Sequence, residues 1–420
     1  MRGDFMRADL KNTNRILLGC CVPLAMLIAL AGAPATGAEK VVYSFQGGSD
    51  GVDPGGPLIA DNIGNFYGPA GGGGGGTGCK RGNDGCGVVF KLASDGTEAV
   101  LHAFAGGCDG AFPSGGLAED GRGNLYGTTQ QGGECNNNEG LGTVFEIAAD
   151  GTESVLHAFK GGSDGELPSG TLILDKKGNL YGTTPEGGNL SDCDGYGCGT
   201  VFELTPKGKK TVIYAFQGGN DGLSPQGAVI MDNAGNLYGT TGGGGGSPNC
   251  DVGCGTVFKI APGGIESVLY SFQGGSDGSG PITGLTADSA GNLYGTTTYS
   301  GSNDDGTVFK VTPGGTETVL YSFQPGGGGE FPDAGVILDK AGNLYGTTYE
   351  GGDSGCKGRG CGVVFKLAPD GTETVLYAFA NRLGASPAAG LLMGKNDTLY
   401  GTTTAGGKDR DGVVFKVTTK

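Results

Sequence analysis

The sequence predicts an all-β protein, a seven-bladed β-propeller of four-stranded blades, and three observations lead to this fold class. The heptapeptide GNLYGTT occurs five times without change, and GNFYGPA and DTLYGTT are looser copies of it. Each copy stands in a unit with four strand-like stretches separated by turn residues. The two ends of the chain supply complementary parts of one unit.

The repeat is 51 to 59 residues long when its copies are aligned on the tyrosine of LYG. A period of this length that contains only strand patterns indicates propeller blades or a solenoid. In the third copy the strand-like stretches are TLILD (171–175), NLYGTT (179–184), GTVFELT (199–205) and KTVIYAF (210–216). We name these four positions strands a, b, c and d.

The chain ends distinguish a closed ring from a solenoid. The stretch KVVYSF (40–45) is a d strand without its a, b and c strands, and GVVFKV (412–417) is a c strand without its d strand. Joined, they complete one blade and leave no open sheet edge. A solenoid would instead need distinct caps at both ends.

Residues 1–38 differ from the rest of the chain. Four basic residues precede an apolar run at 16–31, and the small residues GAPATGA follow. This order predicts a signal peptide that is cleaved after Ala35 or Ala38, which would send the mature chain, 39–420, to the periplasm, the cell surface or the medium. A retained membrane anchor and lipidation at Cys20 are the alternatives.

The mature chain is strongly acidic, with a formal charge of −18 against −16 for the whole sequence. Such a charge disfavours nucleic acid and anionic membranes as partners, and it is compatible with cations and with neutral partners. We therefore expect a glycan or protein ligand, no nucleic acid, no membrane contact after signal cleavage, and a monomer.

Loop lengths indicate the functional face. The distance between the phenylalanines of strands c and d is constant at 14 residues, whereas the distance from the LYG tyrosine to the phenylalanine of strand c varies from 15 to 23. Because successive strands alternate in direction, the b–c and d–a loops emerge on one face, here called the b–c/d–a face. Variable loops on a rigid scaffold are where recognition usually resides.

Ten cysteines follow the signal segment, and the fold pairs all of them. Eight form four pairs, each inside one b–c loop, and the other two lie in one d–a loop and the next b–c loop. The predicted disulfides are Cys79 with Cys86, Cys108 with Cys135, Cys193 with Cys198, Cys250 with Cys254, and Cys356 with Cys361. Zinc binding is the alternative, but no histidine or second CxxC stands near these cysteines.

Five d–a loops carry an aspartate at the same position of the repeat. These residues are Asp50, Asp109, Asp164, Asp221 and Asp277. They are candidate ligand-binding residues and candidate calcium ligands, because calcium takes oxygen from carboxylates and carbonyls. The alternative, which we favour, is a tight Asp-Gly turn, since only one carboxylate recurs per loop. We predict no other cofactor.

The histidines argue against most catalytic mechanisms. His102 and His157, the two histidines of the chain, occupy a position that holds tyrosine in the other blades, so we interpret them as structural. An enzyme would then need paired carboxylates or an activated tyrosine. Glu166, Glu330 and Glu350 interrupt the repeat pattern near the b–c/d–a face, so glycoside hydrolysis by two carboxylates is an alternative.

Five aromatic residues in the loops of this face have no counterpart in most copies of the repeat. They are Phe112, Tyr196, Tyr299, Phe331 and Tyr349. Aromatic side chains of this kind can serve as anchors for a ligand, and loop packing is the alternative role. We predict that they bind a ligand.

The pattern GNLYGTT, a glycine-rich insertion and then GTVFKLxPxGTETVLYSFxGGxDGxxPxGGL resembles the GloVer (Gloeo_Verruco) tandem repeat of secreted bacterial proteins. The resemblance covers about 39–420 and implies a repeat region that is exported and joined to different surface anchors. It implies no catalytic residues. Because the sequence ends at VFKVTTK without a sorting tail, we expect release rather than surface anchoring.

Together these observations predict an exported, non-enzymatic binding or scaffold module that uses the b–c/d–a face. One alternative is a carbohydrate-active hydrolase or lyase with carboxylate or tyrosine chemistry in the central funnel. Another is a purely structural repeat protein that calcium stabilises through the five aspartate loops.

Overall fold

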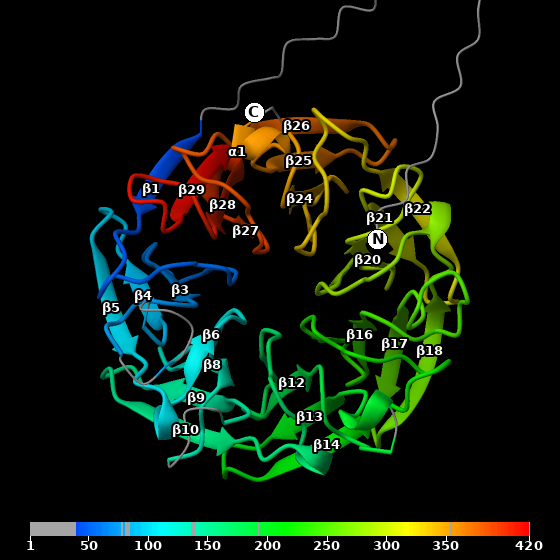
Figure 1. Cartoon of the computed structure of the whole chain (residues 1–420), viewed down its shortest axis with the longest axis horizontal. Helices are drawn as coiled ribbons and strands as arrows, with labels where there is room; N and C mark the ends of the chain where they lie inside the picture. Colours follow the sequence, from blue (N-terminus) through cyan, green and yellow to red (C-terminus); the bar gives the residue numbers. More distant parts are fainter. Residues whose placement is uncertain are drawn as a thin grey trace, which may run out of the picture. The chain divides into compact units, whose positions relative to one another are not determined.

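A computed structural model describes residues 39–76, 79, 85–135, 140–191, 193–352 and 355–419. The predicted signal peptide, 1–38, lies outside these residues. The described strands form seven separate sheets of antiparallel strands, and the sheets follow one another around a ring (Figure 1). The predicted seven-bladed β-propeller is therefore confirmed.

The strands of each blade run from the channel outward in the order a, b, c, d. The first three blades consist of β2 (Ile59–Ala60), β3 (Phe66–Ala70), β4 (Val88–Leu92) and β5 (Glu98–Ala103); β7 (Ala118–Glu119), β8 (Leu125–Gln131), β9 (Thr143–Ile147) and β10 (Glu153–Ala158), with β6 (Ala111–Pro113) also beside β8; and β11 (Ile173–Leu174), β12 (Leu180–Thr184), β13 (Thr200–Leu204) and β14 (Lys210–Ala215).

The next three blades are built in the same way. They consist of β15 (Ile230–Met231), β16 (Leu237–Thr241), β17 (Thr256–Ala261) and β18 (Ile265–Ser271); β19 (Thr286–Ala287), β20 (Leu293–Thr297), β21 (Thr307–Val311) and β22 (Glu317–Ser322); and β23 (Ile337–Leu338), β24 (Leu344–Thr348), β25 (Val363–Leu367) and β26 (Glu373–Ala378).

The seventh blade joins the two ends of the described chain. Its strands are β27 (Leu392–Met393), β28 (Thr398–Thr403), β29 (Val413–Thr418) and β1 (Lys40–Ser44). Strand β1 pairs with β29 in an antiparallel register in which Lys40 is opposite Lys416 and Ser44 is opposite Val413. The blue and red ribbons lie together in Figure 1 for this reason, and the predicted closure of the ring is confirmed.

Strand a is shorter than predicted. The stretch 171–175 contributes only Ile173–Leu174 to the sheet, and strand a has two residues in every blade. Asp175 ends the strand because its carboxylate accepts hydrogen bonds from the N–H groups of Lys177 and Asn179, which starts the turn into strand b. The residues before Ile173 line the central channel instead of extending the ladder.

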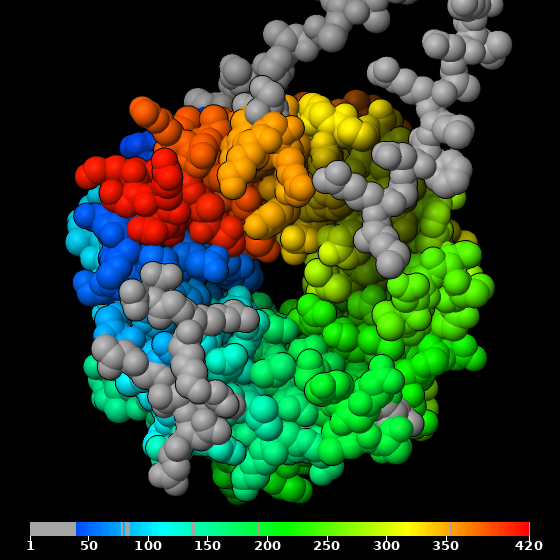
Figure 2. Space-filling model, viewed as in Figure 1, coloured from blue at the N-terminus to red at the C-terminus, as the bar shows by residue number. Residues whose placement is uncertain are grey.

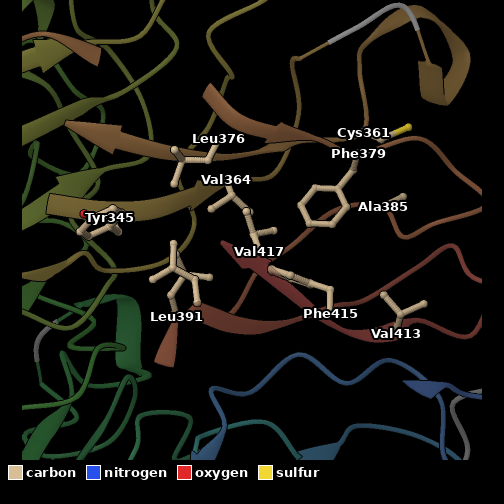
Figure 3. Packing of buried hydrophobic residues seen from close by; sticks show 11 residues of the cluster. Tyr345, Cys361, Val364, Leu376, Phe379, Ala385, Leu391, Val413, Phe415 and Val417 are labelled. Atoms are coloured by element: carbon tan, nitrogen blue, oxygen red, sulfur yellow. The ribbon is translucent and has the colours of Figure 1, made fainter. Parts of the chain in front are cut away.

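The hydrophobic core lies between neighbouring blades. The phenylalanine that follows each strand d meets the strand c phenylalanine of the next blade edge-to-face, with ring centroids 4.9 to 5.3 Å apart at all seven interfaces. Figure 3 shows one such pair, Phe379 and Phe415, among the buried residues of the sixth and seventh blades. Edge-to-face aromatic pairs add about 1 kcal/mol each beyond the burial of their area.

Candidate functional site

The b–c and d–a loops lie against each other on one face, as the loop lengths predict. In six of the blades a residue of the d–a loop forms an isolated antiparallel bridge with the b–c loop, for example Glu330 with Glu350, and in the second blade β6 makes the equivalent contact with β8. The b–c and d–a loops of each blade therefore form one continuous surface.

The five repeated aspartates each hold their own loop in place. The carboxylate accepts the N–H of the residue four positions earlier, at 2.6 Å for Asp50 and 2.9 Å for Asp164. It also meets the Tyr or His of the preceding strand d, as in the 2.7 Å bond from the Tyr43 hydroxyl to Asp50. These contacts agree with the predicted Asp-Gly turn, and calcium binding by these residues stays a prediction. In the loop with Gly328, the Glu330 carboxylate accepts the N–H of Gly326 at 2.8 Å instead.

The same aspartates face the neighbouring blade. Four of them lie beside a glutamate that is the first or second residue of strand d in the next blade. Burial and the charge of the aspartate raise the pKa of this glutamate. The pKa rises to about 7 for Glu98, Glu266 and Glu317 and to about 6 for Glu153. Beside the remaining aspartate, Asp164, a lysine replaces the glutamate, and this Lys210 forms an ion pair with Asp164.

The residue before the proline of each d–a loop has a left-handed backbone. Six of the seven are not glycine, namely Asp53, Phe112, Leu167, Ser224, Phe331 and Ser386, with φ between 56° and 60°. This conformation costs on the order of 1 kcal/mol per residue. The N–H of this residue bonds to a carbonyl in the b–c loop of the previous blade, as Phe331 does to Asp305 at 3.0 Å. The left-handed conformation is thus found where a backbone N–H group bonds one blade to the previous one.

The residue after that proline faces the central channel, which Figure 2 shows as an opening in the ring. The channel has a volume of about 330 Å³, and its described lining is largely glycine and alanine. The polar side chains at this position are Ser114, Ser169, Gln226 and Asp333. Asp333 is the one charged residue among the described lining residues. Burial raises the pKa of its carboxyl, a hydrogen bond with Thr298 opposes this in part, and the charge of Glu350 raises the pKa further.

Three of the predicted aromatic residues come together beside Asp333. The rings of Tyr299 and Phe331 are 6.2 Å apart between centroids, at an angle of 60°. The N–H of Tyr349 bonds to the carbonyl of Phe331 at 2.9 Å, and Glu350 follows it. We call Tyr299, Phe331, Asp333, Tyr349 and Glu350 the fifth–sixth blade cluster, because their loops belong to those two blades. Tyr299 is 55% exposed, so about half of this residue is open to solvent.

The other two predicted aromatic residues lie elsewhere. Phe112 is 6% exposed and packs with the buried residues between the first and second blades, where its edge lines a hollow of about 370 Å³. Tyr196 is 67% exposed in the b–c loop of the third blade. Ligand binding by these two residues stays a prediction.

Sequence reasoning missed Asp333 and Thr298. The signal for Asp333 was present, because the position after the d–a proline changes from copy to copy, reading Gly, Ser, Ser, Gln, Ile, Asp and Ala around the ring. A position that varies inside an otherwise constant repeat points to an individual role. Its place in the channel, however, depends on the left-handed residue two positions before it.

The repeat itself decides the family. The model of the Gloeobacter/Verrucomicrobia repeat matches residues 30–189, 75–286 and 247–420, which cover the whole propeller. The chain belongs to this repeat family. The resemblance found in GNLYGTT and the residues around it is therefore confirmed. A search of curated protein sequences found no match to this Gloeobacter/Verrucomicrobia repeat protein.

Two solved structures align with this repeat protein. The extracellular domain of a protein described as a one-component system of B. thetaiotaomicron aligns with a TM-score of 0.53 at 10% identity, over 89% of this chain and 39% of that one. A gluconolactonase of Xanthomonas campestris aligns with a TM-score of 0.43 at 16% identity, over 74% of this chain and 87% of its own. The first of these alignments indicates a shared fold and nothing about activity.

All five predicted disulfides are present in the repeat protein. They join Cys79 to Cys86, Cys108 to Cys135, Cys193 to Cys198, Cys250 to Cys254, and Cys356 to Cys361. Five disulfides are typical of a protein that folds outside the reducing cytoplasm. No helix in the described part of the chain is both long and apolar enough to cross a bilayer.

Proposed function

We propose that this protein is an exported, non-catalytic binding module that holds a neutral glycan at the fifth–sixth blade cluster. The observation that carries the proposal is the aromatic pair of Tyr299 and Phe331 beside the carboxyl groups of Asp333 and Glu350. The apolar face of a sugar ring packs on an aromatic side chain, and its hydroxyls donate hydrogen bonds to carboxylates. One cluster therefore offers both kinds of contact that a sugar needs.

Position and charge support the same ligand class. Asp333 of the cluster lines the channel, the other members belong to loops of the b–c/d–a face, and ligand sites are usually concave and built by such loops. The mature chain carries a formal charge of −18, which repels anionic polymers and leaves neutral ones unaffected. A neutral polysaccharide outside the cytoplasm fits both conditions.

The test is retention of the mature chain, 39–420, on columns of immobilised neutral polysaccharides. We expect the wild-type chain to be retained on at least one polymer. For Tyr299→Ala we expect the retention volume in excess of the void volume to be at least tenfold smaller. Tyr196→Ala is the matched control, because Tyr196 is an exposed tyrosine of another b–c loop. No retention on any polymer, or equal losses from both variants, would contradict the proposal.

One observation favours a second candidate, a glycoside hydrolase or lyase. Burial, with the charge of Glu350, raises the pKa of Asp333, and a carboxyl group with a raised pKa can serve as the acid of such an enzyme. Incubation of the same polymers with the protein distinguishes the two functions. New reducing ends or unsaturated sugars that disappear in Asp333→Asn would favour the enzyme, whereas retention without any product favours the binding module.

A further inference from the structure

Three side chains with metal-binding atoms meet at the outer rim, between the first and second blades. His102 stands on strand β5, Asp109 ends the short 3₁₀ turn Gly107–Asp109, and Glu153 is the first residue of strand β10. Strands β5 and β10 are neighbours on the rim in Figure 1. One nitrogen of the histidine and one oxygen of each carboxylate all lie within 4.8 Å of one another.

The orientation of these groups suits a shared ligand. Asp109 Oδ2 accepts the N–H of Ala105 at 2.6 Å, which fixes the carboxylate while Oδ1 faces His102 Nε2 at 3.0 Å. Glu153 Oε1 is buried and has no hydrogen-bond partner among the described residues, as is also true of the equivalent oxygens of Glu98, Glu266 and Glu317, which lack a histidine beside them. A buried carboxylate oxygen without a partner is costly unless something else satisfies it. We propose that His102, Asp109 and Glu153 form a binding site for one divalent transition-metal ion of the zinc class.

The donor set decides the class of metal. One imidazole nitrogen and two carboxylate oxygens suit zinc and its neighbours in the first transition row, whereas calcium prefers six to eight oxygens. The side chains of His102 and Asp109 are 20% and 21% exposed, so solvent reaches the group. Three protein ligands with access to solvent leave a fourth position for water or for a group from a partner.

A disulfide makes this loop more rigid than the others. Cys108, next to Asp109, is bonded to Cys135, so the d–a loop is tied to a b–c loop. The other four disulfides close a single b–c loop each, with sequence separations of 4 to 7. A ligand set that is fixed in advance loses less conformational freedom when the ion binds.

Among the residues that the structure describes, this combination of histidine, aspartate and glutamate occurs once. At the equivalent positions, three of the five interfaces with a tyrosine hold Tyr–Asp–Glu, as in Tyr214, Asp221 and Glu266. A protonated phenol is a poor ligand for zinc. His157 and Asp164 supply the other histidine and its aspartate, but Lys210 replaces the glutamate there and bonds to Asp164. The equivalent positions thus show two residue combinations that lack the full set of metal ligands, Tyr–Asp–Glu and His–Asp–Lys.

The experiment introduces the same two replacements, tyrosine for histidine and lysine for glutamate, into the proposed site. The mature chain is freed of metal by a chelator and titrated with Zn²⁺, Mn²⁺ and Ca²⁺ by calorimetry. We expect one Zn²⁺ per chain, and an at least tenfold weaker Zn²⁺ affinity in both His102→Tyr and Glu153→Lys. His157→Tyr is the matched control and should bind Zn²⁺ as the wild type does. Both rim variants introduce residues that the repeat already accepts at these positions, so melting without metal should change little.

Cobalt gives a readout that needs no variant. Co²⁺ bound by one imidazole and two carboxylates should show visible d–d absorption that Zn²⁺ abolishes at one equivalent. The proposal is overturned if the wild type binds no Zn²⁺, if Ca²⁺ binds this site in preference to Zn²⁺, or if His157→Tyr weakens Zn²⁺ binding as much as His102→Tyr does.

Discussion

Lys210 on strand β14 and Asp164 in the preceding d–a loop form an ion pair between the second and third blades, with 2.9 Å between Nζ and Oδ1. The Lys210 ammonium also donates to the backbone carbonyl of Asp164. Three other interfaces have a glutamate at the position of Lys210 and, among the described residues, no cation beside the aspartate. Neighbouring blades are therefore held together by two different electrostatic arrangements at one position of the repeat.

Lys210→Glu should convert one arrangement into the other. At pH 8 we expect the free energy of unfolding to fall by about 2 kcal/mol, because a charge-assisted hydrogen bond is lost and two carboxylates meet. At pH 5 the loss should be smaller, since the new carboxyl group can hold a proton. Chemical denaturation at both pH values measures this, with the exposed neighbour in Lys209→Glu as the control. Equal losses at both pH values would contradict the account.

The inter-blade glutamates predict that stability falls as pH rises. Burial raises the pKa of Glu98, Glu266, Glu317 and Glu373 to about 7 from the ordinary value of 4.5. The folded chain therefore binds more protons than the unfolded chain between these values. Their contribution to stability is complete below pH 4.5 and is lost as pH rises through about 7.

We expect the melting temperature to be higher at pH 5 than at pH 8. Replacing all four of these glutamates by glutamine should flatten the profile, because an amide does not ionise, and at Glu98, Glu266 and Glu317 it can donate to the facing aspartate. Glu119→Gln, on an exposed strand end, is the control and should keep the wild-type slope. The turn aspartates such as Asp232 have a lowered pKa. The stability that they contribute to the fold is therefore lost only in more acidic solution, below the range from pH 5 to pH 8. A wild-type melting temperature that rises from pH 5 to pH 8 would refute the prediction.

The glycine of LYG is required by packing. A methyl group on Gly239 would lie 2.5 Å from Cζ of Phe258, which is fully buried. We expect Gly239→Ala to destabilise the fold by about 1 to 3 kcal/mol, the usual cost of overpacking a core. Gly327→Ala is the control, because its added methyl group would meet no atom within 4 Å. Thermal melts of the two variants compare them directly, and equal stabilities would show that the ring of Phe258 can move aside.

The disulfides should differ in their contribution to stability. Cys108–Cys135 closes a segment with a sequence separation of 27, whereas Cys250–Cys254 closes one of 4. Chain entropy predicts that removing the longer link costs about 2 kcal/mol more. Paired Cys→Ser variants, unfolded in denaturant, test the order. A larger loss from the Cys250–Cys254 variant would contradict it.

The sequence predicted the ring well because each blade repeats the same strands and the same core. Strand ends depended on turn contacts such as those of Asp175, which is why strand a came out shorter. The candidate site was only partly predictable. Tyr299 and Phe331 were chosen as exceptions to the repeat, but they belong to loops of different blades, and only the packing of those blades brings their rings to 6.2 Å. Asp333 was not predicted, because its position in the channel depends on the left-handed backbone of one residue, Phe331.

The most direct test of the glycan-binding account is hydrogen exchange of the mature chain with and without a mixture of soluble neutral oligosaccharides. The account predicts slower exchange of the amides at 296–303, 328–335 and 347–352, which contain the fifth–sixth blade cluster, and unchanged exchange in the b–c loop around Tyr196. Protection confined to other loops, or no protection at saturating oligosaccharide, would contradict it.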